Sequence, residues 1–128
     1  MLEHSSLIGF VGVTDLDRAR QFYGETLGLT LRDESPFALV ADVSGTMLRI
    51  TAVEQPAAVP YTVLGWGVAD IGSAIDELAG RGVRFTRYDA MRQDDRGVWT
   101  APGGAKIAWF LDPDGNNLSL TQFAAAGP

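Results

Sequence analysis

The sequence predicts an α+β fold in which the same βαβββ unit occurs twice, and three observations indicate this. Short runs rich in Val, Ile, Phe, Thr and Leu are bounded by Gly, Pro, Asp and Asn, which is typical of strands between turns. Two longer segments carry apolar residues at helical spacing. The order of these signals is the same in both halves of the chain, which indicates an internal duplication.

Strands are expected wherever one of the short apolar runs occurs. Successive side chains of a strand point to opposite faces of its sheet, so each run should pack one face on the helices and turn the other face toward a cavity. The expected strands are residues 7–13, 29–32, 37–42, 46–53, 62–68, 83–87, 106–111 and 117–123.

Both helices are expected to begin at an aspartate and to end at a glycine. Asp15 and Asp70 are good N-caps, because a carboxylate accepts hydrogen bonds from the free amides of the first turn. Gly28 and Gly82 follow the last apolar residues and can adopt the left-handed conformation that ends a helix. The apolar faces are Leu16, Ala19, Phe22, Tyr23 and Leu27 in the first helix, and Ile71, Ala74, Ile75, Leu78 and Ala79 in the second.

The chain is expected to form one domain, residues 1–128, built from two modules. Module one spans residues 6–53 and module two spans residues 61–123. The linker at 54–60 contains two prolines and no periodic pattern, as a connector should. One βαβββ unit is too small to cover both faces of its own sheet, so the modules should pack together or across a dimer.

The composition excludes several classes of partner. The net charge is −6, the pI is about 4.5 and Lys106 is the only lysine, so a nucleic-acid-binding surface is not expected. There is no cysteine for a disulfide, a thiolate metal site or a nucleophile. No apolar run approaches the ~18 residues of a membrane helix, so no membrane partner is expected. We expect a cytoplasmic location.

Three motifs in order give the chain a resemblance to a known family. They are residues 13–23 (VTDLDRARQFY), residues 27–29 (LGL) and residues 112–116 (DPDGN). With them the chain resembles the vicinal oxygen chelate superfamily, which includes glyoxalase I, extradiol dioxygenases, fosfomycin-resistance enzymes and bleomycin-resistance proteins. The resemblance implies the glyoxalase/bleomycin resistance fold, in which two βαβββ modules form a curved, mostly antiparallel sheet around a cavity.

The resemblance also implies where a metal ion would be held in metal-dependent members. Carried over to this chain, the four ligand positions are Ile8, Arg49, Val63 and Ser119. Isoleucine and valine have no lone pair, arginine is a permanent cation and serine alone is a poor ligand. The single histidine, His4, precedes the first strand. We therefore expect no metal and no other cofactor.

Alternation along the strands predicts which residues line the cavity. Residues on the face of the vacant ligand positions should surround a small-molecule ligand, and apolar walls with a few polar groups suit such a pocket. The candidate ligand-binding residues are Phe10, Met47, Arg49, Val63, Gly65, Tyr88, Trp99, Trp109 and Ser119. Residues expected to pack on the helices instead are Val11, Leu48, Ile50, Leu64, Trp66, Leu118 and Leu120.

Two of these positions have two interpretations each. Arg49 either holds a carboxylate, phosphate or phenolate of a ligand, or it forms an internal salt bridge to Asp94 or Asp95 or lies in water near the rim. Gly65 and Gly67 either leave room for a ligand or a dimer partner, or they serve the curvature of the sheet.

The polar stretch 88–100 likewise has two interpretations. It is either a recognition loop, in which Tyr88, Met91 and Trp99 stack on a planar guest, or a solvated loop that Trp99 anchors to the core.

The leading functional hypothesis is a metal-free small-molecule-binding protein that sequesters an aromatic or anionic compound, as bleomycin-resistance-type proteins do. On this hypothesis the protein is not an enzyme, and by resemblance it is a homodimer. One alternative is a metal-dependent lyase, isomerase or dioxygenase of the same superfamily, with displaced ligands drawn from His4, Glu54, Asp94 or Asp95. Another is an enzyme that uses Arg49 and a loop carboxylate without metal.

Overall fold

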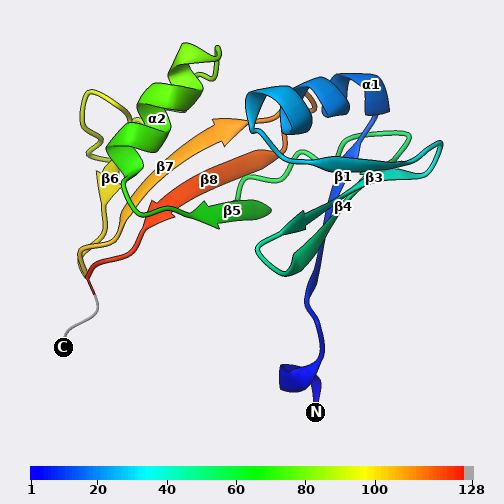
Figure 1. Cartoon of the computed structure of the whole chain (residues 1–128). Coiled ribbons are helices and arrows are strands. Elements are labelled where there is room, and N and C mark those ends of the chain that lie inside the picture. Colours follow the sequence, from blue (N-terminus) through cyan, green and yellow to red (C-terminus); the bar gives the residue numbers. More distant parts are fainter. Residues whose placement is uncertain (126–128) are drawn as a thin grey trace. The chain divides into compact units, whose positions relative to one another are not determined.

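The computed structural model describes residues 1–125, which form two compact units (Figure 1). The first unit comprises Met1–Ala58 and Pro113–Asn116, and the second comprises Val59–Asp112 and the chain from Asn117 onward. Each unit contains one four-stranded sheet and follows the order βαβββ. The α+β class and the predicted repeat are confirmed.

The first unit has a mixed sheet with the strand order β1-β4-β3-β2. Strands β1 and β4 are parallel, and the other two pairs are antiparallel. A short 3-10 turn, η1, precedes the sheet, and the π-helical segment η2 continues the first helix without a break. The elements are η1 (Leu2–His4), β1 (Ile8–Val13), α1 (Leu16–Ala19), η2 (Arg20–Thr26), β2 (Leu31–Glu34), β3 (Ala38–Val43) and β4 (Thr46–Ala52).

The second unit repeats this topology with the strand order β5-β8-β7-β6. Its parallel pair is β5 with β8, and the remaining pairs are antiparallel. The elements are β5 (Leu64–Gly67), α2 (Ile71–Gly80), β6 (Trp99–Thr100), β7 (Lys106–Leu111) and β8 (Asn117–Gln122).

The helices begin where the sequence predicts. The Asp15 carboxylate accepts a hydrogen bond from the Arg18 amide at 3.1 Å, and the Asp70 carboxylate accepts one from the Ser73 amide at 3.1 Å. These bonds satisfy amides that have no partner inside the helix. In residues 1–125 no helix combines the length and the apolar character that crossing a bilayer requires.

The core of each unit lies on the predicted face of its sheet. Val11, Leu48 and Ile50 are buried in the first unit, together with Tyr23 of the helical segment. Full burial of such a side chain contributes roughly 1.5–3 kcal/mol. The second unit buries Leu118 and Leu120 in the same way, whereas Leu64 and Trp66 are half-buried.

The predicted strand at 83–87 is wrong. Only Phe85 forms a bridge, to Phe110, and the outer strand is β6 instead. The Gln93 side chain explains the difference, because its amide accepts from the Tyr88 N–H at 2.7 Å and donates to the Thr86 carbonyl at 2.9 Å. Backbone groups that a longer ladder would use are therefore bonded to a side chain.

Strand β2 begins two residues later than predicted, at Leu31. The Leu29 amide donates to the Tyr23 carbonyl at 3.0 Å, so this residue still belongs to the helix end.

Candidate functional site

The candidate ligand-binding residues divide between the two units. The sheet face of the first unit holds Phe10, Met47 and Arg49. The second unit holds the rest, which are Val63, Gly65, Tyr88, Trp99, Trp109 and Ser119.

The second unit carries an aromatic face, which we define as Tyr88, Trp99 and Trp109. Trp109 lies at its centre, with the Tyr88 ring edge-on at 5.5 Å and the Trp99 ring tilted by 36° at 6.3 Å. The Trp109 indole N–H donates to the Thr62 hydroxyl at 3.1 Å, which fixes the ring. All three rings are half-buried, so they present a rigid surface suited to stacking.

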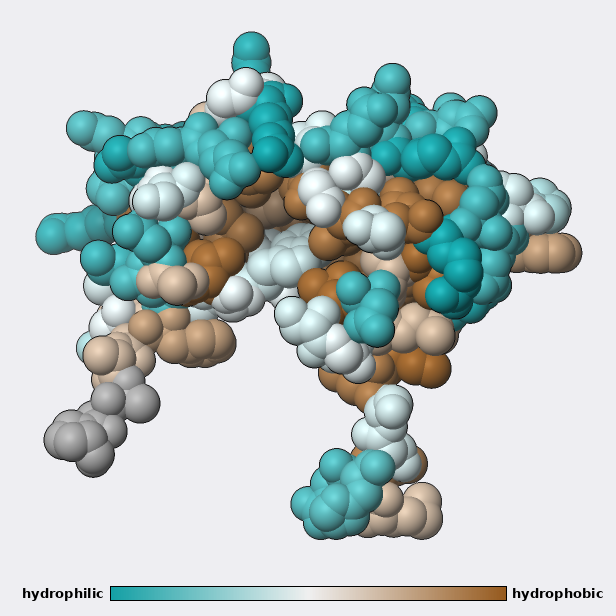
Figure 2. Space-filling model, in the orientation of Figure 1, coloured by the Kyte–Doolittle hydropathy of each residue, from teal (hydrophilic) through white to brown (hydrophobic). Residues whose placement is uncertain are grey.

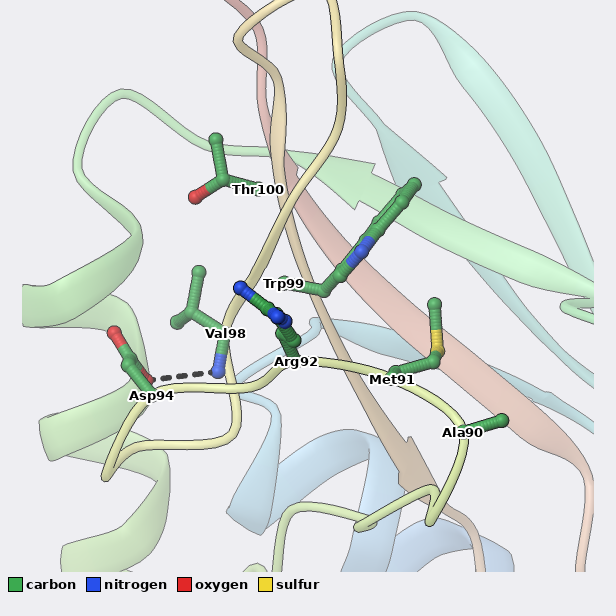
Figure 3. A pocket seen from close by; sticks show the side chains of 7 residues that line it. All are labelled: Ala90, Met91, Arg92, Asp94, Val98, Trp99 and Thr100. Atoms are coloured by element: carbon green, nitrogen blue, oxygen red, sulfur yellow. Dashed lines mark hydrogen bonds between the residues drawn. The ribbon is translucent and has the colours of Figure 1, made fainter.

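A cavity of about 600 Å³ lies next to this face, where the 88–98 segment meets β6. Its lining residues are Ala90, Met91, Arg92, Asp94, Val98, Trp99 and Thr100 (Figure 3). Figure 3 shows Trp99 and Met91 on one side of β6 and Val98 and Thr100 on the other. The cavity therefore combines apolar walls with a few polar groups.

The two charged residues that line this cavity differ in their hydrogen bonds and ion pairs. The Asp94 carboxylate accepts hydrogen bonds from the Arg96 and Val98 amides at 2.9 Å, so it holds the loop. Arg92 is exposed and has no ion-pair partner within residues 1–125. The cavity thus presents a cation whose charge is not neutralised.

The assignment of Trp99 to a loop is wrong, because this residue belongs to β6. It pairs with Ile107 in register, and the single bridge from Gln93 ties the preceding segment to it. The indole is therefore carried by a sheet edge, and side chains on strands are held more firmly than side chains on loops.

Packing explains why residue 65 is a glycine, and neither sequence-based interpretation named this explanation. A Cβ atom on Gly65 would lie 2.7 Å from the Ser119 hydroxyl oxygen, closer than such contacts occur. The space beside the glycine is filled by Ser119, its register partner on β8. Gly67 differs, because a Cβ there would meet Phe123 at an ordinary 3.7 Å.

Asn117 is a feature that the sequence-based selection missed. Only 6% of this residue is exposed, and its amide N–H donates to the Tyr88 hydroxyl at a long 3.4 Å. Its side-chain oxygen has no hydrogen-bond partner within residues 1–125. A buried amide oxygen without a partner costs about 1–3 kcal/mol. Asn117 lies two residues before Ser119 on β8, so strand alternation places both side chains on the same face, and the polar amide beside apolar strand residues could have indicated it.

The first unit carries a charged cluster, which we define as Arg32, Glu34 and Arg49. Both terminal nitrogens of Arg49 lie 3.4 Å from Glu34 Oε1. Arg32 donates to Glu34 Oε2 from Nε at 3.4 Å and from Nη2 at 3.3 Å. Of the interpretations of Arg49, the structure shows the internal salt bridge, but the partner is Glu34 and not the expected Asp94 or Asp95, because the sheet order β4-β3-β2 brings Glu34 onto the same face.

Apolar side chains surround this cluster and are open to solvent. Ile8, Phe10 and Met47 are 45%, 61% and 36% exposed. Figure 2 shows hydrophobic surface gathered over the strands of this unit, bordered by hydrophilic residues. A smaller cavity of about 280 Å³ is lined by Ser6, Leu7, Ile8, Arg32, Val40, Ala41, Asp42, Gly45 and Met47.

The four positions that correspond to metal ligands do not form a donor set that fits a divalent ion. Ile8 and Val63 offer no donor atom, Arg49 is a cation paired with Glu34, and Ser119 offers one hydroxyl. Within residues 1–125 no group of three or more His, Cys, Asp and Glu could hold a metal ion. His4 lies 3.6 Å from Glu3, and both side chains are exposed.

The Asp114 carboxylate has an anchoring role within the first unit. It accepts from the Thr14 amide at 3.1 Å, the Thr14 hydroxyl at 2.6 Å and Arg18 Nη2 at 3.0 Å. Burial raises the pKa of Asp114, but the Thr14 hydrogen bonds and the Arg18 charge outweigh it and hold the pKa below its usual value. The side chain is 4% exposed, so it serves the turn rather than a ligand.

Residues 8–120 match the family model "Glyoxalase/Bleomycin resistance protein/Dioxygenase superfamily". The uncharacterized protein YurT of Bacillus subtilis (strain 168) is 32% identical over 127 residues, covering 86% of this chain and 92% of YurT.

Solved structures of similar fold include TnmS3, an antibiotic binding protein from Streptomyces sp. CB03234. It matches with a TM-score of 0.70 and 23% identity, covering 97% of this chain and 99% of TnmS3. A superfamily member from Sphaerobacter thermophilus DSM 20745 matches with a TM-score of 0.72 and 24% identity, covering 95% and 99%. At this identity the likeness shows a shared fold.

Proposed function

Since the chain belongs to the Glyoxalase/Bleomycin resistance protein/Dioxygenase superfamily, we propose that it is a small-molecule-binding protein that holds a planar aromatic compound. The observation that carries the proposal is the aromatic face beside the cavity of about 600 Å³. Ligand pockets of ≈ 300–1,000 Å³ accommodate drug-sized molecules, so this cavity has a suitable size.

Two contacts of Trp109 favour a flat guest. Trp109 is fixed by Thr62 and flanked by Tyr88, so its ring stays in place when the site is empty. A preorganised ring stacks on a ligand without first losing rotational freedom. The side-chain oxygen of Asn117 supports a ligand or a water that donates a hydrogen bond near Tyr88. TnmS3, an antibiotic binding protein, shares the fold and supports a binding role for this chain.

The proposed capture needs no metal ion. The four corresponding positions supply one hydroxyl and one cation, and such a set does not coordinate Zn²⁺, Ni²⁺ or Mn²⁺. Elemental analysis of the purified protein, before and after incubation with these ions and Fe²⁺, tests this part. One equivalent of tightly held metal would favour the metal-dependent lyase or dioxygenase instead.

Further properties belong to the same proposal. The two modules act as one domain, the protein is a cytoplasmic homodimer, and the nine candidate residues contribute to ligand binding. The exposed side chains of Ile8, Phe10 and Met47 support association, since apolar surface of this kind is costly to leave in water. Sedimentation at micromolar concentration tests the dimer, and a monomer would contradict it.

Tryptophan fluorescence and calorimetry with a panel of planar aromatic compounds test the binding function. The variant Trp99→Ala should weaken binding of any panel member about tenfold, because one stacked ring is lost. Phe37→Ala is the matched control, an exposed aromatic of the first unit that should leave binding unchanged. If no compound binds at millimolar concentration, or if Trp99→Ala binds as well as the wild type, the proposal fails.

A further inference from the structure

We propose that the charged cluster of the first unit is an anion-binding site in which Glu34 is an internal carboxylate that an anionic ligand displaces from Arg49 and Arg32. This rests on the proposed function, which counts Arg49 among the ligand-binding residues, and it adds the class of ligand and the role of Glu34 on the first unit. The ligand class is an organic monoanion, a carboxylate or phenolate, with an apolar body.

The first argument is an excess of hydrogen-bond donors. Each guanidinium has five N–H groups, and Arg32 and Arg49 share a single carboxylate. Both Arg49 contacts go to the same oxygen, so the parallel two-oxygen geometry that arginine prefers with carboxylates is not formed. The two guanidinium groups and one carboxylate leave the cluster with one unneutralised positive charge.

The second argument is the length of the contacts. The four Glu34 contacts are 3.3–3.4 Å long. Other arginine–carboxylate pairs in the same protein are tighter, at 2.7 Å for Arg20 with Asp17 and 2.9 Å for Arg96 with Asp76. Charge-assisted N–H···O bonds are usually ≈ 2.7–2.9 Å. One carboxylate held between two cations therefore satisfies neither well, and a better-placed anion can compete.

The third argument is the surroundings of the cluster. The Arg49 side chain is 29% exposed, so it is partly removed from water yet within reach of a ligand. Phe10 is its register partner on β1, and Val40 lies in register between the two arginines. Their apolar side chains suit the body of an organic anion. Asp42, the other carboxylate of this face, accepts a hydrogen bond from the Gly45 amide at 2.9 Å.

Benzoate and its neutral analogue benzamide are the probes for this site, measured by calorimetry on the full chain. The variant Glu34→Gln removes the internal competitor and should bind benzoate about tenfold more tightly than the wild type does. Arg49→Met should lose benzoate binding. The matched control is Glu77→Gln, which removes the same charge from a pair with Arg81 on α2 and should behave like the wild type. Benzamide should not distinguish Glu34→Gln from the wild type.

A second measurement keeps the inference testable if a variant fails to fold. In the wild type, benzoate should shift the side-chain N–H resonances of Arg32 and Arg49 and leave those of Arg81 and Arg96 unchanged. Equal shifts in all four arginines would mean unspecific ion binding and would overturn the inference. So would a Glu34→Gln variant that binds benzoate no better than the Glu77→Gln control.

Trp99→Ala separates this inference from the proposed function. Benzoate binding that persists in Trp99→Ala supports a site on the first unit, whatever the aromatic panel shows. Benzoate binding that vanishes in Trp99→Ala and persists in Arg49→Met places the anion on the second unit and overturns the inference.

Discussion

The two sheets carry different side chains in the middle of one face. The residues paired in register there are Phe10, Arg49 and Val40 in the first unit and Gly65, Ser119 and Trp109 in the second. In the first unit the edge strand carries a large exposed ring, and the next strand carries a charge. In the second unit the edge strand β5 has a glycine at this position and the next strand, β8, has the small Ser119. The large ring, Trp109, lies on the third strand, β7. The same backbone topology supports a charged face in one unit and an aromatic face in the other.

This difference shows which parts of the repeat are constrained. Both helices begin at an aspartate that caps the first turn, and both closing strands bury two apolar residues, Leu48 and Ile50 in β4 and Leu118 and Leu120 in β8. Those features determine the βαβββ order. The side chains of the opposite face, such as Arg49 and Trp109, are not needed for these features, so the chemistry of that face can differ between the units.

The hairpin turns of the two units differ as well. The β3–β4 turn is local, with Ser44 and Gly45 at positive φ and Asp42 accepting from the Gly45 amide. The β7–β8 turn, Pro113–Asn116, belongs instead to the first unit, where Asp114 is bonded to Thr14 and Arg18.

The turn comparison predicts the largest effect on stability. Asp114→Ala should lower the free energy of unfolding by about 3 kcal/mol, because it leaves the Thr14 amide, its hydroxyl and Arg18 without their buried acceptor. Asp42→Ala removes one bond in an exposed turn and should cost much less. Urea denaturation measures both variants, and equal losses would contradict the comparison.

The face comparison predicts the next largest effect. Gly65→Ala should destabilise the protein by about 2 kcal/mol, because the new methyl group would press on the Ser119 hydroxyl. Ser119→Ala should remove most of that cost in the double variant. Gly67→Ala is the control and should be close to neutral. A double variant with strictly additive losses would show that the Gly65–Ser119 contact is not the cause.

The pH dependence of the Asp114 contribution should be a smaller effect. The pKa of Asp114 is lowered in the folded protein, so its stabilisation is present above the unfolded value of about 3.9 and is lost as the pH falls through the folded pKa. The melting temperature of the wild type should therefore fall more steeply below about pH 4 than that of Asp114→Asn. Parallel curves for the two proteins would show that another carboxylate is responsible.

The smallest effect is expected from two neighbouring asparagines. Asn117→Leu removes an unpaired buried oxygen and a long bond, so the free energy of unfolding should stay within about 0.5 kcal/mol or rise. Asn116→Leu removes a 2.8 Å bond to the Gly12 carbonyl and should cost about 1 kcal/mol. A large loss in Asn117→Leu, measured by urea denaturation, would mean that a bound water completes its bonds.

The local features of the fold could be predicted from the sequence because each depends on a few adjacent residues. Asp15 and Asp70 cap their helices, and alternation put Val11 and Leu118 in the core. The 83–87 segment could not be assigned correctly, since the Thr86 carbonyl and the following Tyr88 amide are bonded to the side chain of Gln93, several residues later in the chain.

The candidate site was less predictable, because its contacts join residues that only the sheet order brings together. Glu34 and Arg49 lie on strands separated by β3, so their pairing depends on register and not on spacing. Gly65 shows the same limit. A glycine in a strand signals a close approach, but only the register with β8 reveals that Ser119 makes it.

The assignment of Pro113–Asn116 to the first unit has a consequence for how the protein is made. The unit that begins the chain is completed by residues that leave the ribosome after Val59–Asp112 of the second unit. A nascent chain that ends at Ala58 has Thr14 and Arg18 but not yet the carboxylate that binds them. Synthesis therefore cannot finish the two units one after the other, and a gene cut at the linker would encode an incomplete first half.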